Sequence, residues 1–486
     1  MTDRLPETAS APRVLFDLST IMRWTGPPVG ILRAAGELAR FARRTLPDVR
    51  FVFFDPDTHG YRLLRDAAVD PVLDEDAVID PIGLPDPTGT RRHGTDRIPA
   101  GLRPAAFWVL QSRHQALMAL ERLRLAGGAA SGVAAAVQDR LAAAKDRAVM
   151  MRGGGDRRPV LSRGAALGPT VAFGPDDVLV CAGTGWHDTD IAAVVREKRE
   201  TGFRLALLCY DLMPLTLPDC FQPHDRALFD AYMRMALPAA DLVLVNAACT
   251  ADDIRAWCGA QGLGVPRTAV VPLGADGPVA PDTGEAAPLP AGLAAGRYAL
   301  FVSTLEPRKN HRVLVAAWRR LIESGAPGIA GFRLVFVGRA GWGSGPLRDE
   351  IAADPRLAAT IVHLAGVEDA TVATLYRGAA FCCYPSRCEG YGLPVVEAFR
   401  FGKAVLASTG GALPEVVADF SPCLDPDDVD AWTAALRSWI ADPAARAVHE
   451  TRIRTAFRHP GWDAAAARFF ACVHEATGSV AGSPGI

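Results

Sequence analysis

Two glutamates eight residues apart flank the stretch of this sequence that is best suited to chemistry. Glu389 and Glu397 lie in EGYGLPVVEA, which follows an apolar run and a short loop. Pro394 indicates the beginning of a helix there, because the missing N–H of proline would have no partner in a first helical turn. Backbone N–H groups and the positive end of the helix dipole would then converge at a phosphate-sized cradle. The cradle residues are Gly390, Tyr391, Gly392 and Leu393.

The carboxylates decide between two interpretations of this stretch. Two glycines and a proline before a helix are most often plain turn chemistry. A carboxylate beside a phosphate cradle, however, needs a partner other than the phosphate, and the hydroxyls of ribose and of a sugar are suitable donors. Glu389 before the cradle and Glu397 about one turn into the helix therefore favour a nucleotide-sugar site.

A pair of cations provides a second candidate element. Arg308 and Lys309 precede an expected helix that ends near Ile322. Arginine is the default cation of this chain, which has only four lysines, and a lysine supplies a compact point charge that suits a diphosphate oxygen. Two cations at the beginning of a helix are electrostatically unfavourable unless an anion compensates them.

Four stretches in order resemble one family. EGYGLPVVEA resembles the paired-glutamate signature of the family 4 retaining glycosyltransferases. FVSTLEPRKN (301–310) resembles the first loop of that family's donor domain, LVFVGRAGW (334–342) its second strand and turn, and GGALPEVV (410–417) the loop and helix after the signature. The resemblance covers most of 297–460.

The resemblance implies roles for individual residues. It places the diphosphate at Lys309 with Arg308 beside it, the ribose hydroxyls at Glu397, and the donor sugar at Glu389, which would also support positive charge at the sugar ring. The catalytic residues would thus be Glu389, Lys309 and Arg308, and no metal would be required.

Two further donor-site residues come from the same resemblance. Ser303 stands where relatives often carry glycine, and its hydroxyl would either bond a phosphate or narrow the site. Arg339 lies in a glycine-rich turn that the resemblance puts near the nucleotide base.

The N-terminal half offers three candidate acceptor-binding residues. Gly30 and Arg33 end the long loop STIMRWTGPPVGILR, which resembles the acceptor-facing loop of some bacterial polysaccharide glycosyltransferases. Asp211, in YDLMP, resembles a segment that lines the cleft between domains. The competing interpretations are a solvated surface arginine for Arg33 and a capping or turn-forming aspartate for Asp211.

Short apolar runs alternating with helical segments predict an α/β fold. The expected strands are 12–17, 49–54, 178–183, 203–210, 241–246, 268–274, 298–303, 332–337, 360–364, 379–384 and 404–408, with a helix over 32–45. The resemblance implies the GT-B architecture: two doubly wound Rossmann-like domains facing across a cleft, with a C-terminal helix crossing back. We expect an acceptor-binding domain over 1–280, a linker at 281–296, a donor domain over 297–460, and the crossover helix and tail over 461–486.

An insertion interrupts the regular pattern at about 85–175. It is rich in Gly, Pro and Ala, with 86–104 and 151–169 resembling loops and with candidate helices at 111–125 and 134–150. Its basic residues are Arg140, Lys145, Arg147, Arg152, Arg157, Arg158 and Arg163. Contact with the anionic inner membrane face, where a lipid-linked acceptor would lie, is one interpretation, and a soluble insertion is the other.

Composition restricts the class of protein. The 486 residues are too many for one core. A net charge of −2 provides no global attraction to nucleic acid. The N-terminus lacks an apolar signal core and no apolar run reaches about 18 residues, so we expect a cytoplasmic protein. The ten cysteines show no metal-binding or disulfide spacing.

The expected reaction is transfer of a hexose from a nucleoside diphosphate sugar to a hydroxyl of a glycan or lipid-linked glycan of the cell surface. The family implies retention of configuration, and GDP-mannose is the favoured donor, with UDP- and dTDP-sugars left open. The alternatives are a non-catalytic nucleotide-sugar-binding partner of another transferase and a nucleotide-sugar isomerase or phosphorylase on a similar scaffold.

Overall fold

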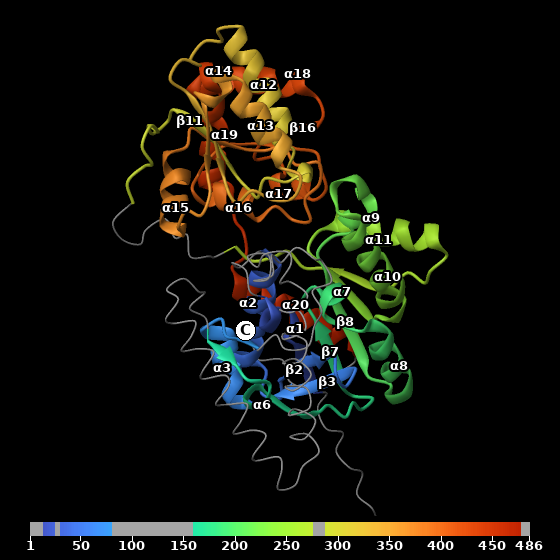
Figure 1. The fold of residues 1–486 in the computed structure, drawn as a ribbon. Helices are drawn as coiled ribbons and strands as arrows, with labels where there is room; N and C mark the ends of the chain where they lie inside the picture. The colour runs from blue at the N-terminus through green and yellow to red at the C-terminus, as the bar shows by residue number, and fades with distance from the viewer. Residues whose placement is uncertain (1–12, 25–29, 80–158, 276–286, 478–486) are drawn as a thin grey trace, which may run out of the picture. The chain divides into compact units, whose positions relative to one another are not determined.

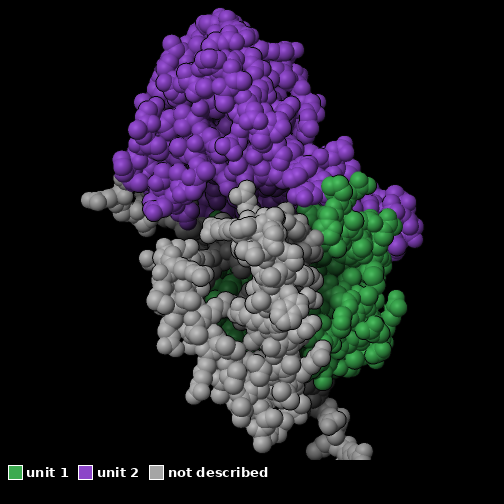
Figure 2. All heavy atoms as spheres, viewed as in Figure 1, with its two compact units in different colours: residues 1–208, 223–243, 472–486 green, residues 209–222, 244–471 purple. Residues whose placement is uncertain are grey.

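The computed structural model describes residues 13–24, 30–79, 159–275 and 287–477. The chain divides into two compact units, which Figure 2 colours separately. Unit 1 contains 1–208, 223–243 and 472–486, and unit 2 contains 209–222 and 244–471. The domain boundaries expected from sequence stay a prediction, as do the facing of the domains across a cleft and the crossing back of the last helix.

The first half of the chain forms an eight-stranded sheet in the order β10-β9-β8-β7-β1-β2-β3-β6 (Figure 1). Its strands are β1 Val14–Asp17, β2 Arg50–Asp55, β3 Gly60–Leu64, β6 Leu167–Thr170, β7 Val178–Cys181, β8 Arg204–Cys209, β9 Leu242–Val245 and β10 Thr268–Val270. β1 is parallel to β2 and β7, and β7 is parallel to β8. β3 is antiparallel to both β2 and β6.

Helices connect these strands. They are α1 Ser19–Arg23, α2 Gly30–Thr45, α3 Asp66–Asp74, α6 Arg163–Ala166, α7 Gly185–Asp188, α8 Ile191–Thr201, α9 Met213–Thr216, α10 Pro223–Ala239 and α11 Ala248–Gln261, with a 3₁₀ turn at Pro218–Cys220. A separate parallel pair joins β4 Val78–Ile79 to β5 Val160–Leu161. The register of this pair sets Val78 beside Val160, so the two described ends that flank 80–158 lie side by side.

The second sheet is parallel at every pairing and runs β13-β12-β11-β14-β15-β16. Its strands are β11 Tyr298–Val302, β12 Arg333–Val337, β13 Ile361–Leu364, β14 Phe381–Tyr384, β15 Val405–Ser408 and β16 Cys423–Leu424. Its helices are α12 His311–Glu323, α13 Gly345–Ala353, α14 Pro355–Ala358, α15 Asp369–Gly378, α16 Leu393–Arg400, α17 Leu413–Val417, α18 Val429–Ala441 and α19 Pro443–Ala456. The last helix, α20 Trp462–Thr477, begins in unit 2 and ends in unit 1. The strands read as continuous apolar runs because helices cover a parallel sheet on both faces.

The sequence predicted this α/β fold correctly, and each expected strand is present with its ends moved by a few residues. Two local expectations are wrong. Residues 19–23 form α1 instead of part of a long loop, and 159–169 contain β5, α6 and most of β6. The helices expected at 111–125 and 134–150 lie outside the described residues, as does most of the insertion. No helix of the described residues is long and apolar enough to cross a bilayer.

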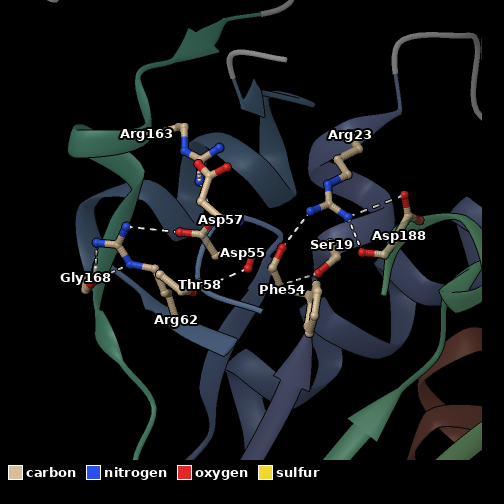
Figure 3. Close-up of polar contacts among 10 residues, drawn as sticks. All are labelled: Ser19, Arg23, Phe54, Asp55, Asp57, Thr58, Arg62, Arg163, Gly168 and Asp188. Carbon is tan, nitrogen blue, oxygen red and sulfur yellow. Dashed lines mark hydrogen bonds and ion pairs between the residues drawn. The ribbon is translucent and has the colours of Figure 1, made fainter. Parts of the chain in front are cut away.

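A buried charge cluster explains why α6 and β6 form (Figure 3). Asp55, at the end of β2, has no exposed side-chain surface and accepts from Arg62 of β3 at 3.3 Å. Arg62 also donates two hydrogen bonds, of 2.9 and 2.7 Å, to the Gly168 carbonyl of β6. Arg163 of α6 pairs with Asp55 and, at 3.0 Å, with Asp57. Two arginines and two aspartates thus neutralise one another and hold β6 at the sheet edge.

A second polar cluster joins the carboxyl ends of β1, β2 and β7 (Figure 3). Ser19 Oγ accepts from the Phe54 N–H at 2.7 Å, and Arg23 Nη2 donates to the Phe54 carbonyl at 2.6 Å. Arg23 also contacts Asp188, whose other carboxylate oxygen accepts from Thr20 at 2.7 Å. Burial lowers the pKa of Arg23, and Asp188 opposes that shift. These contacts fix the loops at the sheet edge where α/β proteins bind ligands.

We expect Asp55→Ala to lower the free energy of unfolding by about 3–5 kcal/mol, because it leaves two nearly buried guanidinium groups without this carboxylate. Denaturant titration measures the loss. Asp252→Ala, which breaks an exposed pair with Arg255, is the control and should cost less than about 1 kcal/mol. Equal losses in the two variants would contradict the structural role of Asp55.

Candidate functional site

Unit 2 brings Glu389 together with both cations predicted from sequence. Lys309 Nζ lies 2.6 and 2.8 Å from the two carboxylate oxygens of Glu389, and Arg308 Nη1 lies 3.3 Å from one of them. Ser386 Oγ donates to the same carboxylate at 2.6 Å. Lys309 and Glu389 are both buried, at 9% and 8% exposure. An ion pair this deeply buried is a weak source of stability, so a functional reason is the better explanation for it.

Contacts between two loops create this pair. Lys309 ends a 3₁₀ turn, Pro307–Lys309, that follows β11, and Glu389 lies in the loop between β14 and α16. The Arg387 N–H donates to the Arg308 carbonyl at 2.8 Å. The Asn310 amide donates to the Pro385 carbonyl at 3.2 Å. Because β11 and β14 are parallel neighbours, both loops leave the same edge of the sheet and can be tied in this way.

Glycines allow other chain segments to pack closely against the backbone at Glu389. The Glu389 carbonyl accepts from the Ala412 N–H at 2.9 Å. A Cβ at Gly411, whose φ is +62°, would lie 2.4 Å from that carbonyl oxygen. A Cβ at Gly390 would lie 2.7 Å from the Tyr210 carbonyl oxygen and 2.9 Å from Asp211 Oδ2. The GGALPEVV stretch therefore positions Glu389 through its backbone.

The charges of the site keep Glu389 ionised. Burial opposes the negative charge, but Lys309 and Arg308 outweigh it and lower the pKa of Glu389 from 4.5 to about 2. Burial, followed by Arg308, lowers the pKa of Lys309, and Glu389 opposes both. The short contacts to both carboxylate oxygens favour the ionised pair. Arg308 also lies 3.2 Å from Glu306, so its charge is shared between two carboxylates.

The expected helix start is present, and its use as a phosphate cradle stays a prediction. α16 begins at Leu393, with Pro394 in its first turn and Gly392 before it at φ +105°. Within the described part of the chain, no acceptor is found for the backbone N–H groups of 390–393. These groups suit an anion at a helix N-terminus. The Tyr391 hydroxyl instead lies 2.8 Å from His459 Nε2, so this residue can serve the cradle through its backbone.

Glu397 lies half-buried on α16, within the same loop–helix segment as Glu389. The hydroxyl of Tyr376, a buried residue of α15, donates to Glu397 Oε2 at 3.3 Å. The same hydroxyl lies 3.1 Å from that of Tyr384 at the end of β14. These contacts orient the Glu397 side chain, and its assignment to ribose stays a prediction.

The glycine-rich turn after β12 packs onto the first loop. Leu305 donates to the Arg339 carbonyl at 2.9 Å and accepts from Gly341 at 2.9 Å. A Cβ at Gly338 would lie 2.1 Å from the Ser303 carbonyl oxygen, so no side chain fits there. Arg339 is exposed, and Ser303 Oγ lies 3.2 Å from His311 Nε2. Both residues stay candidates for the donor site.

The three acceptor candidates have different surroundings. Asp211 follows β8 and accepts from the Met213 N–H at 3.0 Å, as a capping aspartate would. Burial raises its pKa, and Arg308 opposes that shift. Gly30 is exposed at the first residue of α2, and Arg33 is half-buried on the same helix. The acceptor role of Gly30 and Arg33 stays a prediction.

Sequence reasoning missed two residues that complete the site. Ser386 is fully buried and binds the Glu389 carboxylate, and its position three residues earlier in the same loop was the available signal. Asn310 has φ +54°, a left-handed conformation that asparagine tolerates better than most residues. Its location directly after Lys309 could have indicated a tight turn there.

The arrangement could bind an anion beside an ionised carboxylate. No group of three or more His, Cys, Asp or Glu side chains suited to a metal occurs among the residues that the structure describes. The expectation that no metal is needed stays a prediction. A parallel Rossmann-like sheet of this kind is a feature of the GT-B fold, and the assignment of this sheet to a donor domain stays a prediction.

Comparisons with known proteins support this class. Residues 294–455 match the model of the family Glycosyl transferases group 1. The resemblance to family 4 glycosyltransferases is thus confirmed for the second half of the chain.

Similar proteins include two from Escherichia coli. The serotype-specific mannosyltransferase WbdA is 28% identical over 238 residues, which are 47% of this chain and 29% of WbdA. O-antigen chain mannosyltransferase B is 34% identical over 167 residues, which are 34% of this chain and 42% of that protein. The chain therefore matches less than half the length of each.

A solved structure extends the likeness of the fold to the first half. HepE of Anabaena, in complex with UDP, matches with a TM-score of 0.54 at 14% identity, over 95% of this chain and 100% of HepE. The GT-B fold class expected from the sequence is confirmed.

The buried carboxylate predicts an acid-dependent loss of stability. Because the folded-state pKa of Glu389 is lowered from 4.5 to about 2, its ionised form contributes stability above pH 4.5, and this contribution disappears as pH falls from 4.5 to 2. The difference in unfolding free energy between wild type and Glu389→Gln should therefore shrink between pH 6 and pH 2.5, as measured by urea denaturation. Asp427→Asn, which breaks the exposed pair with Arg387, is the control, and its unfolding free energy should change with pH as that of wild type does. If the difference in unfolding free energy between wild type and Glu389→Gln stayed constant across this pH range, the ionised state of Glu389 would be contradicted.

Proposed function

We propose that this protein transfers a hexose from a nucleoside diphosphate sugar to a hydroxyl of a glycan or lipid-linked glycan. The observation that carries the proposal is the ionised Glu389, held by Lys309 and Arg308 and followed directly by the backbone cradle 390–393. One small region thus offers cations and N–H donors that could bind a diphosphate. The same region offers a carboxylate that could bind sugar hydroxyls. The family match of 294–455 supports the proposal.

The charge distribution suggests how the reaction proceeds. The departing diphosphate develops negative charge, which Lys309, Arg308 and the N–H groups near Gly392 can stabilise without a metal. Glu389 would bind hydroxyls of the donor sugar and stabilise positive charge at the ring. No separate nucleophile is assigned, and we infer retention of configuration by a same-face reaction in which the leaving phosphate accepts the proton of the acceptor hydroxyl.

The donor and acceptor follow from the relatives. Both Escherichia coli relatives are named as mannosyltransferases, one of them for O-antigen chains, which favours GDP-mannose and a growing cell-surface glycan. The UDP in the HepE structure keeps UDP-sugars as the competing donor class. If the protein acts on a lipid-linked acceptor, we expect it in the cytoplasm at the inner membrane face.

Two alternatives differ in what they require of the site. An isomerase or phosphorylase needs its own acid–base pair or cofactor lysine, and it would convert donor without acceptor. A non-catalytic binding partner has no chemical need for Lys309, Glu389 and Glu397 together. Saturable nucleotide binding with no turnover on any acceptor would favour the binding partner.

Thermal unfolding in the presence of GDP-, UDP- and dTDP-sugars tests the donor site. Ligand at 100 times its Kd adds about 2.7 kcal/mol to the free energy of unfolding, which raises the unfolding midpoint. We expect a shift with GDP-mannose that Glu397→Gln reduces, with at least about 10-fold weaker nucleotide binding, because ribose contacts are made already in the ground state. Unchanged nucleotide affinity in Glu397→Gln would refute the ribose role.

Turnover tests the catalytic assignment. We expect Lys309→Ala and Glu389→Ala each to lose roughly 10- to 150-fold in kcat/KM, the equivalent of one charge-assisted hydrogen bond. Lys198→Ala is the matched control. Lys198 Nζ lies 3.0 Å from Asp241 Oδ2, and neither residue belongs to this site. Normal turnover by either site variant would overturn the assignment.

A further inference from the structure

A basic pocket lies in unit 2 outside the candidate donor site. Its volume is about 440 Å³, and α16, α19 and the segment between α19 and α20 form its walls. The cationic side chains that line it are those of Arg400, Arg454 and Arg458. None of the described residues that line this pocket is acidic.

The three arginines are compensated to different degrees. Arg400 donates to the Ala275 carbonyl, which holds the segment before the linker against the end of α16. Arg454 lies 3.6 Å from the half-buried Glu450, one turn earlier on α19. Arg458 Nη1 donates to the carbonyl of its neighbour Phe457 at 2.7 Å, a contact that neutralises no charge. Like charges that line one pocket repel one another, and an anion in the pocket would relieve that repulsion.

The walls of the pocket are partly apolar. Phe399 and Phe457 meet edge to face with ring centroids 5.0 Å apart, and they give the pocket an apolar side. Gly402 has φ +67°, and a Cβ there would lie 3.0 Å from Arg454 Cγ. The absence of a side chain at Gly402 therefore lets the Arg454 stem lie across the end of α16. An ordered apolar wall beside several guanidinium groups suits a ligand that carries both a phosphate and carbon groups.

We propose that this pocket binds the phosphate group of an anionic ligand. Guanidinium groups bind phosphate through paired N–H donors, and Arg454 and Arg458 come from opposite ends of the segment 454–458 that borders the pocket. The phosphate has two chemical sources, a phospholipid headgroup and a soluble phosphate compound. The site is distinct from the donor cradle, since neither Lys309 nor 390–393 lines it.

Titration with inorganic pyrophosphate tests the pocket by calorimetry. The titration uses the full chain carrying Lys309→Gln, which weakens pyrophosphate binding at the candidate donor site, so its outcome does not depend on the proposed transfer reaction. We expect Arg454→Gln and Arg458→Gln each to weaken binding about 10-fold or more. Arg452→Gln is the matched control, because Arg452 lies on the same helix but pairs with Asp419 outside the pocket, and it should change binding less than twofold.

Vesicles distinguish the two sources. Cosedimentation with phosphatidylglycerol vesicles, but not with phosphatidylcholine vesicles, that Arg454→Gln and Arg458→Gln abolish would support the phospholipid headgroup. Pyrophosphate binding without vesicle binding would support a soluble phosphate compound. No binding of either probe, or equal losses in Arg452→Gln and the pocket variants, would overturn the proposal. Arg458→Glu serves as a second variant and should reduce binding further than Arg458→Gln.

Discussion

The candidate site depends on one buried ion pair. Lys309 and Glu389 are nearly excluded from solvent, and each would be costly to bury alone. Their pairing requires the loops after β11 and β14 to meet, which the Arg308 carbonyl and the Asn310 amide secure. Glu389 is then fixed a second time through its carbonyl, by the 410–412 segment. Gly390 and Gly411 cannot carry a side chain, because other chain segments lie too close to them to leave room for a Cβ atom. The local sequence is thus explained by the position of one carboxylate.

Much of the fold could be predicted because parallel strands leave a local signal. The strands β11 to β15 of the second sheet are apolar runs bounded by turn residues, and that pattern located them, whereas the two-residue β16 was not predicted. The antiparallel edge β3–β6 was missed for a physical reason. β6 owes its place to Arg62 and Arg163, which contact Asp55 and the Gly168 carbonyl across about a hundred residues of sequence, and no local pattern reports such contacts. The short helix α1 is likewise held by Phe54 and Asp188, which lie far along the chain.

In the candidate site, too, the residues could be proposed from local sequence but their contacts could not. Glu389, Glu397, Arg308 and Lys309 were recognised from residue type and spacing, and the structure joins Glu389 to both cations. What the sequence could not provide was the partner of each group. Lys309 was expected to meet a diphosphate, but in the structure its ammonium contacts the carboxylate that was expected to meet the sugar. Tyr391 was expected at the donor, yet its hydroxyl contacts His459, a residue that also lines the basic pocket. Partner choice depends on loop geometry, which single-sequence patterns do not contain.

The pairing also constrains how a diphosphate could bind. Lys309 and Arg308 carry two positive charges, and Glu389 and Glu306 carry two negative charges within 3.3 Å of them. The cluster is therefore close to neutral, and a diphosphate would not be drawn to it by net charge. Attraction must come from individual hydrogen-bond donors instead of net charge. The N–H groups of 390–393 have no acceptor among the described residues, and the ammonium of Lys309 has three equivalent donors that could turn from one oxygen to another. A neutral, preorganised cluster of this kind would bind the ground-state donor moderately and reserve its strongest contacts for the charge that develops as the bond to the sugar breaks.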